Sequence, residues 1–228
     1  MRRSIGALLA CTVAACVPIA PSAPAPGPAP GPAISAESLA VADSILVRLT
    51  TTRGAIDLML RRDWAPLGAA RVGEAVAAGY YDGARFFRAL RGFVVQWGIA
   101  ADSATTASWR GRSIADDTVR QSNRRGTVSF AAGGPNTRTV QLFVNLRDNA
   151  RLDAMGFAPV GEVVSGIDAV DALYTGYGEA APAGSGPSQR DLGNQGESYL
   201  ARAFPLLDQI QTARIVRVWP RSGALPSR

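Results

Sequence analysis

The sequence predicts a fold dominated by β-structure: a closed antiparallel barrel of eight strands that is capped by two helices. Three observations lead to this prediction. About eight short runs are rich in β-branched and aromatic residues and are bounded by turn residues. Only two segments carry the apolar spacing of an amphipathic helix. Strands and helices do not alternate along the chain as they do in folds with a parallel sheet.

The folded domain is expected over residues 43–221. Its first helix should begin with Asp63 as the cap and Pro66 in the first turn, and it should end at Gly79. The second helix should cover residues 167–174. The expected strands cover residues 44–50, 55–60, both halves of 86–96, 127–131, 141–145, 159–164 and 212–219.

Two segments do not fit this pattern of strands and helices. Residues 100–125 are polar and irregular, and Asp116 and Asp117 within them indicate a turn or a helix cap rather than catalysis. Residues 176–208 are expected to form an insertion, in which a loop rich in Gly, Pro and Ser is followed by a helical turn that is broken at Pro205.

The composition excludes several classes of enzyme. The chain contains no histidine, which excludes catalysis of the Ser-His-Asp type and every His-ligated metal site. Its only cysteines, Cys11 and Cys16, lie near the N-terminus, so we expect no disulfide, metal site, catalytic thiol or cofactor in the folded domain. The net charge of +6 comes entirely from arginine without a basic run, so nucleic-acid binding is not expected.

The first residues have the features of an export signal. A basic start, MRRS, precedes an apolar run over residues 5–15 that is too short to span a bilayer. The letters VAAC at 13–16 resemble the lipobox of bacterial lipoproteins, in which Cys16 carries the lipid; an ordinary signal peptide that contains a cysteine is the alternative. We therefore expect residues 1–16 to be a signal peptide with a lipobox. The expected location is the periplasmic side of a bacterial cell envelope, with anchoring in the outer membrane as one option.

A linker is expected over residues 17–42. Residues 17–33 are almost wholly Pro, Ala and Gly and hold seven of the fifteen prolines, a composition that does not form a packed core. An extended tether of this length reaches about 50 Å and would hold the domain away from a membrane surface. Residues 222–228 are expected to be a short tail.

The stretch 86–96 carries the candidate functional residues. It predicts two short strands joined at a corner, with Arg88 on the same face as Phe86, and Gln96 on the same face as Val94. Polar side chains on apolar strand faces are costly unless they have partners. They indicate a pocket whose polar groups are aimed at a ligand or, for Arg88, a sheet rim at which the head group reaches water.

Apart from the insertion, residues 45–219 resemble the cyclophilin family of peptidyl-prolyl isomerases. The resemblance is carried by the order of several motifs rather than by any one of them. The insertion resembles an exported bacterial branch of this family. The motifs are YDG at 81–83, FFR at 86–88, GFVVQ at 92–96, GTVSFA at 126–131, GPNT at 134–137, QLFVN at 141–145, LD at 152–153, VGEVV at 160–164 and GID at 166–168.

The resemblance implies a site that acts on the peptide bond before proline. Arg88 matches the catalytic arginine of the family, and Gln96 matches a glutamine that orients the substrate. Ala131 and Ala132 match an edge strand that pairs with the substrate backbone, and Gln141 lies beside them. The residues that match the walls of the proline pocket are Phe93, Val94, Phe143 and Leu152.

Several positions depart from the family pattern. Phe87 and Phe157 stand where many members have histidine, and Gly156 is an alternative match for the second position because the loop carries one extra residue. Arg151 matches a tryptophan that supports cyclosporin affinity in some members, so we expect weak cyclosporin binding. Trp97 replaces a small residue and should affect local loop geometry more than chemistry.

The implied function is rotation about X–Pro bonds in exported proteins, so the expected partners are proline-containing polypeptides. The reaction breaks no bond and needs only preferential binding of the twisted amide, to which Arg88 can donate a hydrogen bond. Two alternatives remain at this point: a non-catalytic proline-binding or chaperone module, and a lipoprotein that serves as an envelope scaffold. We expect a monomer.

Overall fold

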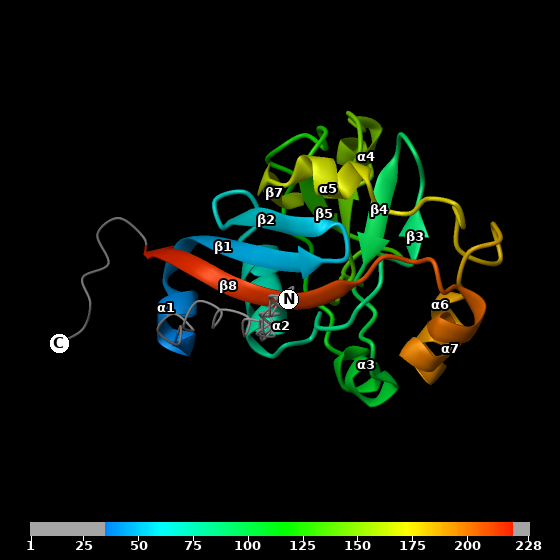
Figure 1. Cartoon of the computed structure of the whole chain (residues 1–228). Helices are drawn as coiled ribbons and strands as arrows, with labels where there is room; N and C mark the ends of the chain where they lie inside the picture. The colour runs from blue at the N-terminus through cyan, green and yellow to red at the C-terminus, as the bar shows by residue number, and fades with distance from the viewer. Residues whose placement is uncertain (1–34, 221–228) are drawn as a thin grey trace, which may run out of the picture. The chain divides into compact units, whose positions relative to one another are not determined.

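The computed structural model describes residues 35–220 and builds them around one eight-stranded antiparallel sheet (Figure 1). The strand order is β3-β4-β6-β5-β7-β2-β1-β8. The eight expected strands are therefore confirmed, whereas the predicted signal peptide, Cys16 and most of the predicted linker lie outside the described residues. The strands are β1 (Ala42–Thr51), β2 (Gly54–Arg61), β3 (Arg88–Ala89), β4 (Val94–Trp97), β5 (Thr127–Phe130), β6 (Leu142–Asn145), β7 (Pro159–Ser165) and β8 (Ile210–Pro220).

The sheet is not closed by a continuous ladder in the described part of the chain. Its edges are β3 and β8. The segments just before these two strands meet at an isolated antiparallel bridge between Arg85 and Gln209, beside which the Phe86 N–H donates to the Asp208 carbonyl at 3.1 Å. The two ends of the sheet thus approach each other, but the closed barrel that the sequence predicts is not confirmed.

The main helix is α2 (Pro66–Ala77), and its cap differs from the expected one. Asp63 was expected at this position, but the carboxylate of Asp117 accepts hydrogen bonds from the N–H groups of Leu67 at 3.0 Å and Gly68 at 2.8 Å. These donors have no partner within the helix, and a carboxylate also interacts favourably with the positive end of the helix dipole. The role of Asp117 as a helix cap is therefore confirmed, and Asp63 as the cap is wrong.

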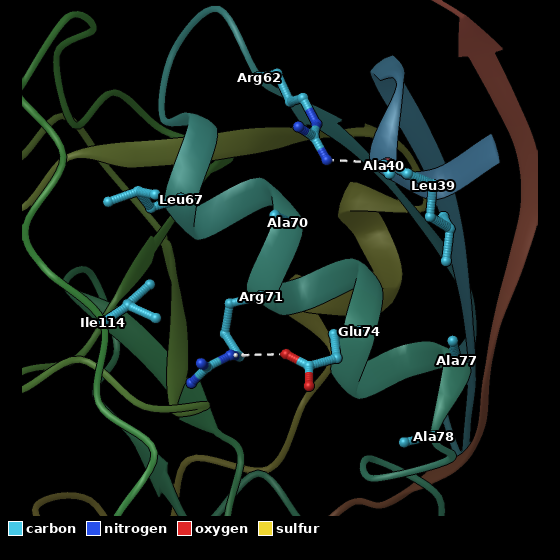
Figure 2. A pocket seen from close by; sticks show the side chains of 10 residues that line it. All are labelled: Leu39, Ala40, Arg62, Leu67, Ala70, Arg71, Glu74, Ala77, Ala78 and Ile114. Atoms are coloured by element: carbon cyan, nitrogen blue, oxygen red, sulfur yellow. Dashed lines mark hydrogen bonds and ion pairs between the residues drawn. The ribbon is translucent and has the colours of Figure 1, made fainter. Parts of the chain in front are cut away.

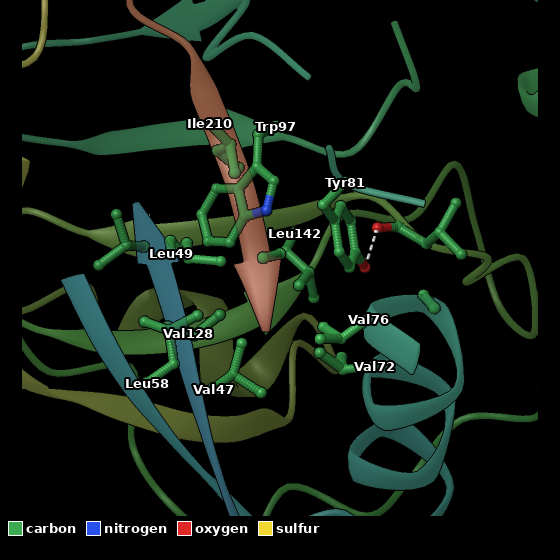
Figure 3. Packing of buried hydrophobic residues seen from close by; sticks show 14 of the residues in the cluster. Val47, Leu49, Leu58, Val72, Val76, Tyr81, Trp97, Val128, Leu142 and Ile210 are labelled. Atoms are coloured by element: carbon green, nitrogen blue, oxygen red, sulfur yellow. Dashed lines mark hydrogen bonds between the residues drawn. The ribbon is translucent and has the colours of Figure 1, made fainter. Parts of the chain in front are cut away.

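The apolar face of α2 covers the sheet. Figure 3 shows Val72 and Val76 directed toward Tyr81 and Leu142 in this core, which also includes Val128. The helix comes close to the sheet because Gly68 has no side chain: a Cβ at this position would lie 2.5 Å from Val160. This packing holds the strands that carry the candidate site.

The other helices in the described residues are short. The helix expected over 167–174 is confirmed as α5 but ends at Asp171. The sequence prediction missed α3, although Asp102 caps it, and it missed α1, which lies in the range predicted as linker. No helix within residues 35–220 has the length and apolar character that crossing a membrane requires. The short helices are α1 (Ala36–Ala40), α3 (Ser103–Trp109), α4 (Arg151–Ala154), α5 (Ile167–Asp171), α6 (Gln189–Gln195) and α7 (Glu197–Ala203).

The insertion shares an apolar cluster with residues that flank β3 and β4, and we call it the insertion cluster. Its buried members are Phe87, Ile99, Leu192, Leu200 and Leu207. It brings α6 and α7 against the segment that leads into β3, as their positions in Figure 1 also indicate. The insertion is therefore packed onto the strand that carries Arg88 rather than projecting from the domain.

Candidate active site

The candidate active site is a hollow of about 370 Å³ that is bordered by β4, β6, α4 and the insertion. A larger hollow of about 670 Å³ lies along α2 (Figure 2). There Arg71 and Glu74 pair with each other, as Figure 2 shows, and the rest of the lining is mostly apolar. The smaller hollow is the better candidate because several polar side chains converge on an apolar wall. Its lining residues are Arg88, Phe93, Val94, Gln96, Ala131, Ala132, Phe143, Leu152, Met155, Phe157, Glu179 and Gln189.

The apolar wall of this hollow is a small cluster separate from the main core. Val94, Phe143 and Leu152 are its buried members, and Phe93 and Phe157 pack against them. The rings of Phe143 and Phe157 meet edge to face with centroids 5.8 Å apart, a favourable aromatic geometry. The result is an apolar cup whose lining includes the three aromatic rings of Phe93, Phe143 and Phe157.

The polar edge of the hollow starts from the pairing of β3 with β4. In this register Arg88 lies opposite Gln96, so both side chains reach the same end of the cup. Arg88 Nη1 donates to Gln96 Oε1 at 3.2 Å, and Gln96 Nε2 donates to Gln141 Oε1 at 2.8 Å. The side chain of Gln96 is therefore held between two partners, and the Arg88 side chain is 19% exposed.

Glu179, which belongs to the insertion, pairs with Arg88 at the same edge. Its two carboxylate oxygens accept from Arg88 Nε and, at 2.7 Å, from Arg88 Nη2. The hydrogen bond from Arg88 lowers the pKa of Glu179 below its usual value, against the opposing effect of burial. The carboxylate is thus ionised at neutral pH and forms a two-point ion pair with the guanidinium.

A buried hydrogen-bond network supports the wall from behind. The carboxylate of Asp153, on α4, accepts from Ser122 Oγ at 2.6 Å and from Asn123 Nδ2 at 2.7 Å. Asn123 Nδ2 also donates to the carbonyl of Phe157 at 2.8 Å, and Ser129 Oγ donates to Asn123 Oδ1 at 2.8 Å. Burial alone would raise the pKa of Asp153, but the hydrogen bonds from Ser122 and Asn123 outweigh it and lower the pKa.

A second branch of the network holds Phe93. Asn149 Nδ2 donates to the Phe93 carbonyl at 3.1 Å and to Asn145 Oδ1 at 2.8 Å. Asn123, Asn145 and Asn149 are each at most 2% exposed. Because buried polar groups are costly unless they are satisfied, this network fixes the backbone on two sides of the cup.

Most of the residues that the sequence predicts for the site come together in this hollow. Gln141 is the exception: it lines a neighbouring hollow of about 110 Å³ and contacts the site only through Gln96. Two residues, Phe157 and Gly156, could match the second position at which many family members have histidine. Phe157 lines the site and Gly156 does not. Cys16, the predicted lipid anchor, lies outside the described residues.

The sequence reasoning missed Glu179, Met155 and Gln189 as lining residues. An acidic residue beside glycines in the insertion was the only signal for Glu179. Arg151, which stands where some members of the family have tryptophan, places its guanidinium carbon 5.0 Å from the centroid of the Phe93 ring. Within residues 35–220 no three His, Cys, Asp or Glu side chains are grouped to hold a metal ion.

Comparisons with known proteins give a consistent result. The family model described as cyclophilin type peptidyl-prolyl cis-trans isomerase/CLD matches residues 46–189, more than half of the 228 residues. Peptidyl-prolyl cis-trans isomerase A of Dickeya dadantii (strain 3937) is 35% identical over 143 residues, which are 60% of this chain and 74% of the relative. Peptidyl-prolyl cis-trans isomerase CYP18-1 of Arabidopsis thaliana is 32% identical over 141 residues, 58% of this chain and 86% of the relative.

Solved structures show a similar fold. The crystal structure of a Cryptosporidium parvum cyclophilin type peptidyl-prolyl cis-trans isomerase matches with a TM-score of 0.57 and 21% identity, over 76% of this chain and 98% of that chain. A crystal structure of the same protein in the presence of the dipeptide Ala-Pro matches with a TM-score of 0.55 and 20% identity, over 75% of this chain and 99% of that one.

Proposed function

This chain belongs to the family of cyclophilin-type peptidyl-prolyl cis-trans isomerases, and from this we infer how its own residues accelerate rotation about X–Pro bonds. The activity is that of its family. The proposal concerns the mechanism: Arg88 stabilises the twisted amide while the cup of Phe93, Phe143, Leu152 and Phe157 holds the proline ring.

The chemical problem is a barrier of about 18–20 kcal/mol that arises from the partial double bond of the amide. At the top of this barrier, conjugation is lost and the prolyl nitrogen gains a lone pair that can accept a hydrogen bond. A donor that binds this nitrogen only in the twisted state lowers the barrier without proton transfer. The mechanism therefore does not require a histidine or any other acid-base group.

Arg88 has donors for this role. A guanidinium carries five N–H donors, and the bonds to Glu179 and Gln96 use three of them. Two donors are left for the substrate at the edge of the cup. A charge-assisted hydrogen bond in such a site supplies about 1.5–3 kcal/mol.

This amount does not account for the whole acceleration by itself. A hundred-thousand-fold acceleration requires about 7 kcal/mol. The balance comes from holding the proline ring against Phe143 and Leu152 while the preceding carbonyl rotates, and from excluding the water that favours the planar amide.

The substrate backbone is proposed to lie along the end of β5. The Ala131 N–H already donates to the Gln141 carbonyl at 3.0 Å. In the described part of the chain, the backbone groups of Ala132 have no hydrogen-bond partner, and this residue lines the cup. Ala132 can therefore pair with an extended peptide, and this requires no particular side chain.

The observation that carries the proposal is the position of Arg88 and Gln96 at the rim of an aromatic cup. The test is exchange NMR or a protease-coupled assay on an Ala-Pro peptide, with Arg88→Ala as the variant. Arg61→Ala is the control because Arg61 forms a partly exposed ion pair with Glu162, outside the lining of the cup. We expect loss of most of the acceleration in Arg88→Ala only; an equally active Arg88→Ala would contradict the mechanism.

The same test separates the enzyme from a non-catalytic proline-binding module. Phe87 and Trp97, which departed from the family pattern, are buried in the insertion cluster and the main core and do not line the cup. These substitutions therefore do not favour the non-catalytic alternative. Peptide binding without faster exchange in the wild-type protein would be the result that establishes it.

We also propose export and anchoring for this chain. Support comes from the basic start, the apolar run at residues 5–15 and the lipobox-like cysteine at Cys16, together with similarity to relatives from bacteria. Its clients would then be proline-containing proteins of the cell envelope. Mass spectrometry of the mature N-terminus tests this: a lipidated Cys16 supports anchoring, and cleavage elsewhere without lipid contradicts it.

A further inference from the structure

The insertion supplies a charged side chain to the site, and we propose that Glu179 is a positioning residue that holds the Arg88 guanidinium in its working orientation. This inference rests on the proposed function, because it assigns a role in the same reaction. It also assigns the insertion a role in the reaction, in addition to its packing against Phe87.

The geometry of the pair favours positioning. Glu179 binds the side edge of the guanidinium, through Nε and Nη2, and Gln96 binds Nη1. Contacts with two partners on different nitrogens fix both the plane and the rotation of the group, because a bidentate pair restricts direction as well as distance. An arginine without such partners would sample many rotamers and would lose their entropy on each productive encounter.

Glu179 is itself held by the loop that carries it. Its carboxylate accepts from the Ala180 N–H at 2.8 Å, and its carbonyl accepts from the Gly186 N–H at 2.8 Å. A Cβ at Gly184 or Gly186 would lie 2.5 or 2.7 Å from the Glu179 carbonyl oxygen, so the loop closes this tightly only with glycine at both positions.

The loop is attached to the insertion cluster by aromatic contacts. The Tyr177 ring lies 5.0 Å from the ring of Phe204 and 5.1 Å from the ring of Tyr174, centroid to centroid. Tyr177 stands two residues before Glu179 and packs on the buried members of the cluster. The position of the carboxylate is therefore set by packing and not only by its attraction to Arg88.

The opposite role would be inhibition, in which Glu179 competes with the substrate for Arg88. The donor count argues against it, because the bonds to Glu179 and Gln96 together leave two N–H groups of Arg88 unused. The hollow in front of the pair also stays open, with about 370 Å³ for a substrate. Glu179 occupies the side edge of the guanidinium and does not fill the cup.

The test compares Glu179→Gln with a matched control, Glu197→Gln. Glu197 is in the same insertion, pairs with Arg85, and has a side chain that is 33% exposed, against 32% for Glu179. Glu179→Gln keeps the shape of the side chain but replaces one of the two acceptor oxygens by an NH₂ group, which cannot accept from Arg88. We expect kcat/KM for an Ala-Pro peptide to fall by at least about tenfold, toward the hundredfold that misplacing a catalytic group by about 1 Å can cost. The loss should lie in kcat, and Glu197→Gln should stay within about twofold of the wild type.

A double-mutant cycle distinguishes positioning from a general structural effect. If Glu179 acts through Arg88, then Glu179→Gln in the Arg88→Ala background should not change the residual rate. Thermal unfolding of Glu179→Gln and Glu197→Gln shows whether the fold is retained. Glu179→Asp keeps a carboxylate that can pair with Arg88, so it should restore part of the kcat/KM that Glu179→Gln loses.

The remaining outcomes overturn the inference. An unchanged or faster rate in Glu179→Gln would do so, as would a loss that persists in the Arg88→Ala background, or a change confined to KM. A wild-type protein without isomerase activity would instead refute the proposed function. A wild-type rate that depends on Arg88 but not on Glu179 would refute only the positioning role.

Discussion

Replacing Arg88 by lysine tests whether the site needs a positive charge or the specific shape of a guanidinium. Lysine keeps the charge but presents three donors from a single nitrogen. It cannot bind both oxygens of Glu179 along one edge, donate to Gln96 and still direct a donor to the substrate in the same fixed plane. The variant therefore removes the directed hydrogen bond and leaves the charge in place.

The expected magnitude follows from the loss of one charge-assisted hydrogen bond to the twisted amide. Such a bond contributes about 1.5–3 kcal/mol. At about 1.4 kcal/mol for each factor of ten, this corresponds to a loss of about 10- to 150-fold in kcat/KM. The ion pair itself is partly exposed, with side-chain exposures of 19% for Arg88 and 32% for Glu179, so solvent screening limits any further contribution from it.

The assay is exchange NMR on an Ala-Pro peptide, in which the cis and trans signals are measured at equilibrium and no protease is needed. Arg151→Lys is the matched control, since the guanidinium carbons of both arginines lie over the Phe93 ring, at 5.9 Å for Arg88 and 5.0 Å for Arg151, but Arg151 does not line the cup. Its rate should stay within about threefold of the wild type, because an exposed cation–π contact is worth about 0.5–1 kcal/mol. An Arg88→Lys variant within about twofold of the wild type would show that charge alone suffices, and would refute the argument from guanidinium geometry.

Three further predictions concern the support of the site. Asn123→Ala should lower the free energy of unfolding by about 2–4 kcal/mol in urea titrations, because it leaves Ser129 Oγ and the Phe157 carbonyl without the hydrogen bonds that they share with the Asn123 side chain; a loss below about 1 kcal/mol would contradict this. The lowered pKa of Asp153 means that its contribution to stability is complete well above its usual pKa of 3.8 and is lost as the pH falls below this value; urea midpoints between pH 6 and pH 3 should therefore fall less steeply in Asp153→Asn, and equal slopes would count against the prediction. Gly161→Ala should destabilise the pairing of β2 with β7 by about 1–3 kcal/mol, because a Cβ would lie 2.2 Å from the Met59 carbonyl oxygen; an unchanged thermal midpoint would show that the backbone accommodates it.

Local patterns in the sequence were sufficient to predict those elements whose structure depends mainly on neighbouring residues. Alternation with period two predicted the strands, including the two short strands that carry Arg88 and Gln96, whereas the β3–β4 register shows in addition that these two residues lie opposite each other. The limits of α5 and the presence of α3 were less accessible, because a helix of seven residues or fewer has little intrinsic stability and forms through its tertiary contacts.

The sequence by itself determined the eight strands, the family, and the identity of most residues that line the cup. Only the tertiary structure decided that Asp117, rather than Asp63, caps α2, and that Glu179 binds a side chain 91 positions earlier in the chain. The physical reason is that strand alternation depends on each residue and its near neighbours, whereas these contacts depend on how distant segments pack. The charge of a carboxylate can be read from the sequence, but its partner is set by the fold that brings the two together.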